Sequence, residues 1–160
     1  GGLLDVGVYT VALSSMIFGE PKRVAGLAHL GETGVDEQAA YVLAFDGGKL
    51  ASLSCAVRTN TPQEARIDGT EGTIRIPGFW HATTATLQAR GNRETVEMPF
   101  TGNGYNYQAI EVMRCLRAGL KESPLMPLDE SLRILRTMDE LRRHWGLAYP
   151  GETPSAVAAR

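Results

Sequence analysis

The sequence predicts an α+β fold, with an open, mainly antiparallel sheet of about six or seven strands and helices on one face. Apolar residues recur every three or four positions at both ends of the chain, which is typical of amphipathic helices. In the middle of the chain they alternate with polar residues, and short turns separate the alternating segments. Because parallel strands need long crossover connections, strands joined by such turns pair antiparallel.

Three helices are predicted, over residues 2–18, 105–120 and 128–145. The first ends at Gly19 and Pro21, two residue types that commonly follow a helix. Each has an apolar stripe that we expect to cover the sheet. The stripes are Leu4, Val8, Val11 and Phe18; Ala109, Met113, Leu116 and Leu120; and Leu128, Leu132, Leu135, Met138, Leu141 and Trp145.

Seven strands are predicted between the first and second helices. The turn signal Asp46-Gly47-Gly48 joins two of them in a hairpin. Short turns at Thr70-Glu71 and Gly91-Asn92 form two more. The segments are 22–32, 37–46, 49–57, 64–69, 72–77, 84–90 and 94–99.

The chain is long enough for one domain with a core, which we expect over residues 1–150, followed by a mobile tail over 151–160. The strand at 37–46 has apolar residues on both faces. One face would pack on the helices, so the other favours a partner, and we expect a homodimer through the open face of the sheet. The missing initiator Met indicates a fragment of a longer protein.

Several classes of function are disfavoured by composition. The net charge of −2, with both signs interleaved, argues against nucleic-acid binding. No apolar run is long enough to span a membrane and no secretory leader can be recognised, so we expect a cytoplasmic protein. Cys55 and Cys115 are far apart in the sequence and form no CxxC motif, so we expect both to be buried, reduced thiols. The histidines His29, His81 and His144 lack metal-ligand spacing, and no glycine-rich phosphate loop occurs.

The first predicted helix carries the candidate chemistry. Asp5 and Tyr9 are four residues apart and therefore share a face. Gly7 lies between them, at a cost to the helix of about 1 kcal/mol relative to Ala, which indicates a close neighbour: a flat ligand ring or another helix. A phenol can donate a proton in carbonyl reduction when a cation assists it. A solvated carboxylate and a half-buried core tyrosine are the structural alternatives.

Aromatic residues mark a second candidate region. Phe79, Trp80 and His81 follow the predicted strand that ends at Pro77-Gly78, and Tyr105 begins a predicted helix. Aromatic residues at a strand end often line a substrate pocket, although core or interface packing explains them equally well.

The segment "GGLLDVGVYTVALSSMIFGEP" resembles the start of the second domain in the glucose–fructose oxidoreductase / inositol dehydrogenase (Gfo/Idh/MocA) family. That domain opens on a G-G-x-x-x-D-x-G-x-[H/Y] helix, and here the motif falls on Gly1, Gly2, Asp5, Gly7 and Tyr9. Residues 69–87 resemble the family's strands beside the substrate pocket, and residues 104–150 resemble its closing helix pair. Tyr rather than His at position 9 is similar to the branch that includes the dimeric dihydrodiol dehydrogenases.

The resemblance implies a glyceraldehyde-3-phosphate dehydrogenase-like C-terminal domain, with the Rossmann domain that binds NAD or NADP absent from these residues. It implies that Tyr9 donates a proton to a sugar or polyol carbonyl, that Asp5 orients the substrate or Tyr9, and that Gly7 lies close to the cofactor. In the family the assisting lysine belongs to an E-K-P motif in the Rossmann domain, which would be the partner of this chain. Here Glu20-Pro21-Lys22 only reorders that motif, and Lys49 and Lys121 also lie outside the first helix.

Two functions remain open at this point. The chain is either the substrate-binding and dimerising part of an NAD(P)-dependent oxidoreductase, or a non-catalytic dimerisation or ligand-sensing module of the same fold. In the first case we expect the isolated chain to be inactive.

Overall fold

A computed structural model describes residues 1–152 of the chain, which form two compact units. The first unit contains residues 1–61 and the segment from Met126 onward, and the second contains residues 62–125. The predicted domain over 1–150 therefore contains two units, which are described separately below. Residues 153–160, most of the predicted mobile tail, lie outside the described residues.

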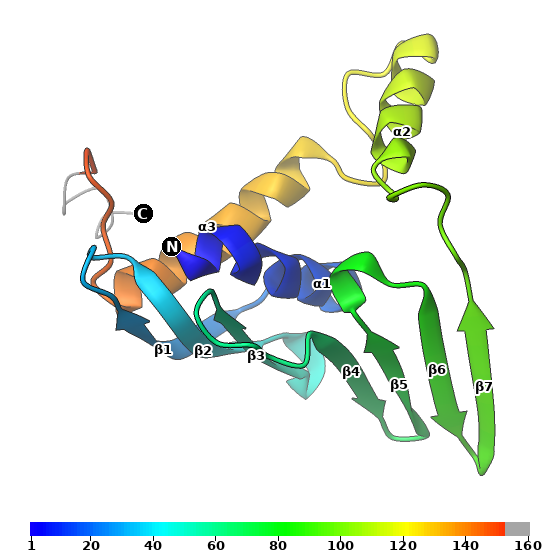
Figure 1. Cartoon of the computed structure of the whole chain (residues 1–160), viewed down its shortest axis with the longest axis horizontal. Coiled ribbons are helices and arrows are strands. Elements are labelled where there is room, and N and C mark those ends of the chain that lie inside the picture. Colours follow the sequence, from blue (N-terminus) through cyan, green and yellow to red (C-terminus); the bar gives the residue numbers. More distant parts are fainter. Residues whose placement is uncertain (153–160) are drawn as a thin grey trace. The chain divides into compact units, whose positions relative to one another are not determined.

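The first unit is a helical layer on a three-stranded antiparallel sheet (Figure 1). Its strands lie in the order β1-β2-β3. The π-helix η1 and the helices α1 and α3 pack on one face of this sheet, and the 3-10 turn η2 joins β2 to β3. The bounds are Leu3–Gly7 (η1), Val8–Phe18 (α1), Arg23–Leu30 (β1), Asp36–Ala44 (β2), Asp46–Gly48 (η2), Leu50–Ala56 (β3) and Leu128–His144 (α3).

The core of the first unit lies between the helices and the sheet. Along β2, Ala39, Tyr41 and Leu43 are buried under the helices, whereas Ala40 and Val42 on the other face are exposed. This alternation is what a sheet covered on one side requires. The remaining buried apolar members of the cluster are Leu3, Val11, Phe45, Cys55, Ile134, Met138 and Leu141.

A β-bulge interrupts the pairing of β1 with β2. His29 lies opposite Gln38, but Leu30 lies opposite Asp36, so that Glu37 is an extra residue on β2. A bulge turns the side chains beyond it to the other face of the sheet. Asp36 therefore joins Ala39 and Tyr41 on the helix-facing side, where its exposed fraction is 0%.

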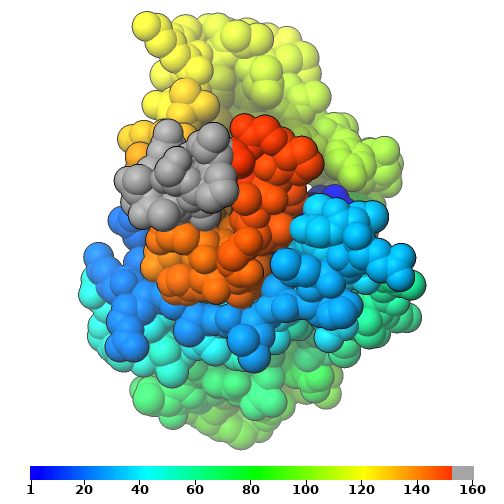
Figure 2. Space-filling model, turned by 90° about the vertical axis from the view of Figure 1, so that its left-hand side faces the viewer, coloured from blue at the N-terminus to red at the C-terminus, as the bar shows by residue number. Residues whose placement is uncertain are grey.

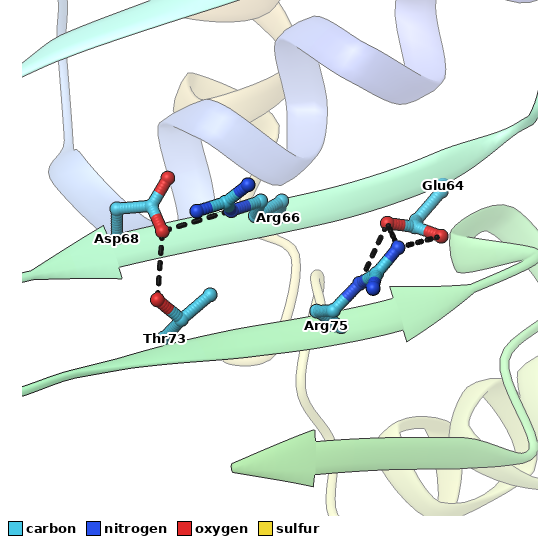
Figure 3. A network of polar contacts seen from close by, with 5 residues as sticks. All are labelled: Glu64, Arg66, Asp68, Thr73 and Arg75. Carbon is cyan, nitrogen blue, oxygen red and sulfur yellow. Dashed lines mark hydrogen bonds and ion pairs between the residues drawn. The ribbon is translucent and has the colours of Figure 1, made fainter. Parts of the chain in front are cut away.

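The second unit contains a four-stranded antiparallel sheet in the order β4-β5-β6-β7. On one face of β4 and β5, Arg75 bonds to Glu64 and Arg66 bonds to Asp68, which also accepts a bond from Thr73 (Figure 3). Exposed pairs of this kind contribute little to stability. The bounds are Glu64–Gly69 (β4), Gly72–Pro77 (β5), Phe79–His81 (the 3-10 turn η3), Thr84–Ala89 (β6), Asn92–Glu97 (β7) and Asn106–Arg117 (α2).

The structure confirms the α+β class and the antiparallel pairing of seven strands joined by short turns. It places these strands in two sheets, because the segment between β3 and β4 makes no strand ladder and passes through a positive φ of 52° at Gln63. Prediction of a single sheet was wrong in this respect.

The predicted covering role of the second helix is also wrong. α2 does not pack extensively on the strands of its own unit, and Met113, Leu116 and Leu120 of its predicted stripe are exposed. Of the helices, α1 and α3 provide the cover for the three-stranded sheet. The stripe was amphipathic in sequence, but periodicity does not tell which surface an apolar face will meet.

Both cysteines are buried and reduced in the structure. Within residues 1–152, no group of three or more His, Cys, Asp or Glu side chains could hold a metal ion. None of the helices in that range is long and apolar enough to cross a membrane.

Candidate active site

The first helix begins with a wide turn that the sequence did not predict. Residues Leu3–Gly7 form a π-helix, and the α-helical geometry begins only at Val8. Asp5 lies in the π-helical turn and Tyr9 in the first α-helical turn, and both side chains are exposed. Tyr9 has an exposed fraction of 46%. Single π-helical turns are rare and occur frequently at functional sites.

The beginning of this turn is held by a carboxylate from the sheet. The backbone N–H of Leu3 donates a 2.5 Å hydrogen bond to Oδ2 of Asp36, and no side chain of the helix itself caps this end. An acidic group at a helix N-terminus also compensates the positive end of the helix dipole. The other oxygen of Asp36, Oδ1, is buried without a hydrogen-bond partner.

Tyr149 lies next to Asp36. An added Cβ at Gly1 would meet Oδ1 of Asp36 and the hydroxyl of Tyr149 together. Figure 2 shows the segment after α3 in red, beside the light-blue segment between β1 and β2. Arg142 lies 4.3 Å from the ring centroid of Tyr149 and also pairs with Glu152. Burial, followed by the nearby Asp36 charge, raises the pKa of Tyr149.

The end of the turn is held by hydroxyl groups. The carbonyl of Gly7 accepts hydrogen bonds from Thr10 Oγ1 at 2.8 Å and from the Tyr41 hydroxyl at 3.3 Å. The two hydroxyls lie 2.6 Å apart. Each has one hydrogen, so the shortest bonds are satisfied when Tyr41 donates to Thr10 and Thr10 donates to Gly7.

The close approach expected at Gly7 is made by the protein's own core. A Cβ at this position would lie 3.1 Å from Cys55 Sγ, 3.1 Å from the Tyr41 hydroxyl and 3.0 Å from Leu3 Cδ1. Gly7 is buried on the sheet side of the helix. On this side of the helix, the neighbours that exclude a side chain are Leu3 and the strand residues Cys55 and Tyr41. The cofactor contact at Gly7 stays a prediction.

The buried region between the first helix and the sheet disfavours the ionised forms of its side chains. Burial raises the pKa of Tyr41, with a further increase from the nearby Cys55. Burial likewise raises the pKa of Cys55 to about 11, assisted by the charge of Asp36. Both groups therefore remain protonated near neutral pH, and the Tyr41 hydroxyl stays a hydrogen-bond donor.

The lysines of the first unit are engaged away from the start of the helix. Lys22 forms an ion pair with Asp46 at 3.5 Å, and the Nζ of Lys49 lies 6.0 Å from the ring centroid of Phe18. Both contacts are at the end of the unit where α1 finishes and β2 turns into β3.

The aromatic candidates gather in the second unit. Phe79, Trp80 and His81 form η3 directly after β5, and a left-handed glycine, Gly78, with a φ of 54°, precedes them. The rings of Trp80 and His81 stack with centroids 5.3 Å apart. Trp80 is half exposed, and its Nε1 donates a 2.7 Å hydrogen bond to Gln63 Oε1.

The same cluster reaches the start of α2. The His81 ring lies 4.1 Å from that of Phe100, and its Nε2 is 2.9 Å from the carbonyl oxygen of Asn103. The backbone N–H of Tyr105 bonds to the side chain of Asn103, and the Tyr105 ring is exposed. The structure therefore brings Asp5 and Tyr9 together in one unit and the aromatic candidates together in the other.

The sequence analysis did not identify Asp36, Thr10 and Tyr41 as functional candidates. An Asp at the start of an apolar strand and a Tyr in its interior are the only signals that could have drawn attention to them. They come together at the π-helical turn because of the β-bulge. No local sequence pattern predicts this bulge.

The fold is shared with known oxidoreductases. An aldose–aldose oxidoreductase from Caulobacter crescentus has a TM-score of 0.78 with 22% sequence identity, covering 90% of this chain and 45% of that protein. The 3-ketoreductase KijD10 from Actinomadura kijaniata, solved with NADP, has a TM-score of 0.76 with 18% identity, covering 91% of this chain and 48% of that one. In class, the chain is therefore an α+β domain with the same fold as these two structures.

Sequence comparison adds a family match. Residues 1–75 match the family model of the GFO/IDH/MocA C-terminal domain. Trans-1,2-dihydrobenzene-1,2-diol dehydrogenase of Mus musculus is 38% identical over 160 residues, which are 94% of this chain and 47% of that protein. The enzyme of the same name from Homo sapiens is 32% identical over 161 residues, covering 94% and 48%. The chain spans about half the length of these relatives.

Proposed function

We propose that the chain is the substrate-binding and oligomerisation part of an NAD(P)-dependent oxidoreductase that acts on the CH–OH or carbonyl groups of sugars, polyols or similar compounds. The observation that carries this proposal is the exposed pair Asp5 and Tyr9 at the π-helical start of the first helix. Its support is the relation to dehydrogenases over 94% of the chain.

Tyr9 is the proton donor in this proposal. When a substrate carbonyl is reduced, negative charge develops on its oxygen, and a phenol within hydrogen-bond reach can deliver a proton there. In the reverse direction the same phenol, once deprotonated, accepts the hydroxyl proton. Asp5, four residues earlier on the same side of the helix, accepts hydrogen bonds from substrate hydroxyls or orients Tyr9.

The cofactor would be held mainly by the partner Rossmann domain. The 160 residues contain no glycine-rich dinucleotide loop, and the space at Gly7 is filled by Leu3, Cys55 and Tyr41. These observations support assigning the dinucleotide site mainly to the Rossmann domain. NAD(P), when bound to the complete protein, supplies or accepts the hydride. The residues of this chain supply the proton and the substrate contacts.

Phe79, Trp80, His81 and Tyr105 are proposed as substrate contacts on the second unit. Exposed aromatic rings such as Trp80 and Tyr105 offer flat apolar surfaces, and His81 adds a ring nitrogen that can exchange hydrogen bonds. Such a combination suits a ligand that has both apolar faces and hydroxyl groups, as sugars have.

The outer face of the three-stranded sheet is proposed as the homodimer interface. Leu27 on β1 has an exposed fraction of 82% and Val42 on β2 one of 42%. The residues around them, Ala25, Ala40, Ser52 and Ser54, are small and exposed. A flat face of this composition can approach a second copy closely. We also keep the cytoplasm as the proposed location.

A non-catalytic dimerisation or ligand-sensing module is the second candidate, because the same outer face serves assembly without chemistry. Activity assays separate the two. The full-length protein should oxidise NADH or NADPH in the presence of a dicarbonyl or a sugar, and residues 1–160 alone should not. Turnover by residues 1–160 alone would contradict the proposed division of roles, and inactivity of the cofactor-loaded full-length protein across a broad carbonyl panel would favour the module.

A further inference from the structure

We propose that strand β2 positions Asp5 and Tyr9 by holding both ends of the π-helical turn, with Asp36 at its first N–H and Tyr41, through the hydroxyl of Thr10, at its last carbonyl. This inference rests on the proposed role of Tyr9. Asp36 and Tyr41 are almost fully buried and act on the backbone of the turn, so we assign them as positioning residues rather than catalytic ones.

The bonds to the turn fall at its two limits. Asp36 accepts from the N–H of Leu3, the first residue of η1, and the hydroxyls of Tyr41 and Thr10 reach the carbonyl of Gly7, its last residue. Asp36 and Tyr41 are both almost fully buried, with exposed fractions of 0% and 2%. Bonds in such a dry environment are strong, and an unpaired group there is costly.

The bulge in β2 makes the arrangement possible. Side chains alternate along a strand, so in a regular ladder Asp36, five residues before Tyr41, would lie on the outer face, opposite to Tyr41. With the bulge, the side chains of Asp36 and Tyr41 both face the helix. Burying a carboxylate costs free energy. The position of Asp36 at the start of the turn is consistent with a role in fixing that turn.

The hydrogen bonds at both ends of the turn fix the relative orientation of the Asp5 and Tyr9 side chains. Residues in a π-helix advance by a smaller angle than in an α-helix, so the length of the wide turn determines the angle between the two side chains. If the turn relaxed to α-helical geometry, the residues before Gly7 would rotate relative to Tyr9. A proton donor displaced by about 1 Å can lose on the order of 100-fold in rate.

The test uses a double-mutant cycle in the full-length protein. Tyr41→Phe removes the hydroxyl with almost no change in shape, and Asp36→Asn keeps an oxygen acceptor whereas Asp36→Ala removes it. We expect Tyr41→Phe and Asp36→Ala each to lower kcat by about 10- to 100-fold, with the affinity for NAD(P)H unchanged and with partial recovery in Asp36→Asn. In a Tyr9→Phe background, Tyr41→Phe should cause no further loss, because it acts through Tyr9.

Thr137→Val is the matched control. Thr137 is also a buried hydroxyl residue, but its Oγ1 bonds to the carbonyl of Arg133 within α3. The Thr137→Val substitution should lower the melting temperature and leave kcat unchanged. Amide hydrogen exchange adds a readout without activity: Tyr41→Phe should speed exchange at residues 3–9 and leave α3 protected.

The outcomes separate this inference from the proposed function. If Tyr9→Phe leaves kcat unchanged, the proposed function fails, whatever the exchange data give. If Tyr9→Phe abolishes activity but Tyr41→Phe and Asp36→Ala keep the wild-type kcat and the wild-type exchange at residues 3–9, only the positioning role is overturned. Additive losses in the Tyr9→Phe background would also overturn it, because they would indicate a purely structural effect.

Discussion

At the scale of single residues, the pKa of the Cys55 thiol indicates how well water is excluded from the space between the first helix and the sheet. Its side chain has an exposed fraction of 5% and lies against the position a Cβ of Gly7 would take. Burial raises its pKa from 9.0 to about 11. This makes Cys55 a measurable probe of the packing between the wide turn and the sheet.

The raised pKa of Cys55 predicts a pH-dependent loss of stability. Below pH 9 the thiol is protonated in both states, whereas between pH 9 and pH 11 only the unfolded chain loses its proton. The free energy of unfolding therefore falls as pH rises through this range, by at most about 1.4 kcal/mol per pH unit for one proton. Urea unfolding at pH 8, 9, 10 and 11 measures it.

Comparison with Cys55→Ala isolates this effect from other titrating groups. The stability difference between wild type and Cys55→Ala should shrink from pH 9 to pH 11, because the variant lacks the thiol. A difference that stays constant over this range would show that the thiol is hydrated in the folded protein.

The sequence could predict Asp5 and Tyr9 but not the residues behind them. The spacing of Asp5 and Tyr9 is a local property of one helix, and their shared exposure follows from it. Asp36 and Tyr41 reach the helix from a strand more than thirty residues away in sequence. For Gly7, the sequence indicated close packing correctly, but it could not say which neighbour would occupy the space.

At the scale of elements, the hairpin of β1 and β2 depends on a glycine inside a strand. Gly26 lies directly opposite Tyr41. A Cβ at Gly26 would stand 2.5 Å from Tyr41 Cβ and 2.7 Å from the carbonyl oxygen of Ala40. Because one of these atoms is backbone, the two strands would have to separate locally.

We therefore expect Gly26→Ala to destabilise the protein by about 1–3 kcal/mol through overpacking. Gly69→Ala is the control, since its Cβ would meet no atom closer than 3.6 Å and its φ lies outside the left-handed region. The control should change stability by less than about 0.5 kcal/mol. Thermal or urea unfolding of both variants measures the difference, and equal stabilities would contradict the packing at Gly26.

The strands were predictable because alternation and turn residues are local signals. The hairpin turn at Asp46–Gly48 and the short turn between β4 and β5 fall where Gly and polar residues predict them. The division into two sheets was not predictable, because it depends on where the chain stops pairing between β3 and β4. The π-helical start was not predictable for a similar reason: the side chains that bond to its two ends come from β2, which is distant in sequence.

At the scale of the whole molecule, the outer face of the three-stranded sheet sets the expected assembly. Val42 lies near the middle of β2, the central strand. A charge placed there would be buried without a partner in the proposed dimer, which is costly. The folded subunit should tolerate the same charge, because the side chain is partly exposed in it.

Val42→Arg should therefore convert a dimer of the full-length protein into a monomer without lowering the melting temperature of the subunit strongly. Analytical ultracentrifugation measures the mass. Leu125→Lys, which changes a residue of the second unit with an exposed fraction of 79%, should leave the dimer intact. A Val42→Arg protein that remains dimeric would place the interface elsewhere.

The most direct test of the central claim is the effect of Tyr9→Phe on kcat in the full-length protein, with the NAD(P)H dissociation constant measured alongside. We expect kcat to fall by about 10²- to 10⁴-fold and the dissociation constant to stay the same. Met16→Leu, an exposed change on the same helix, should leave both unchanged. An unaltered kcat in Tyr9→Phe would contradict the assignment of the phenol as proton donor.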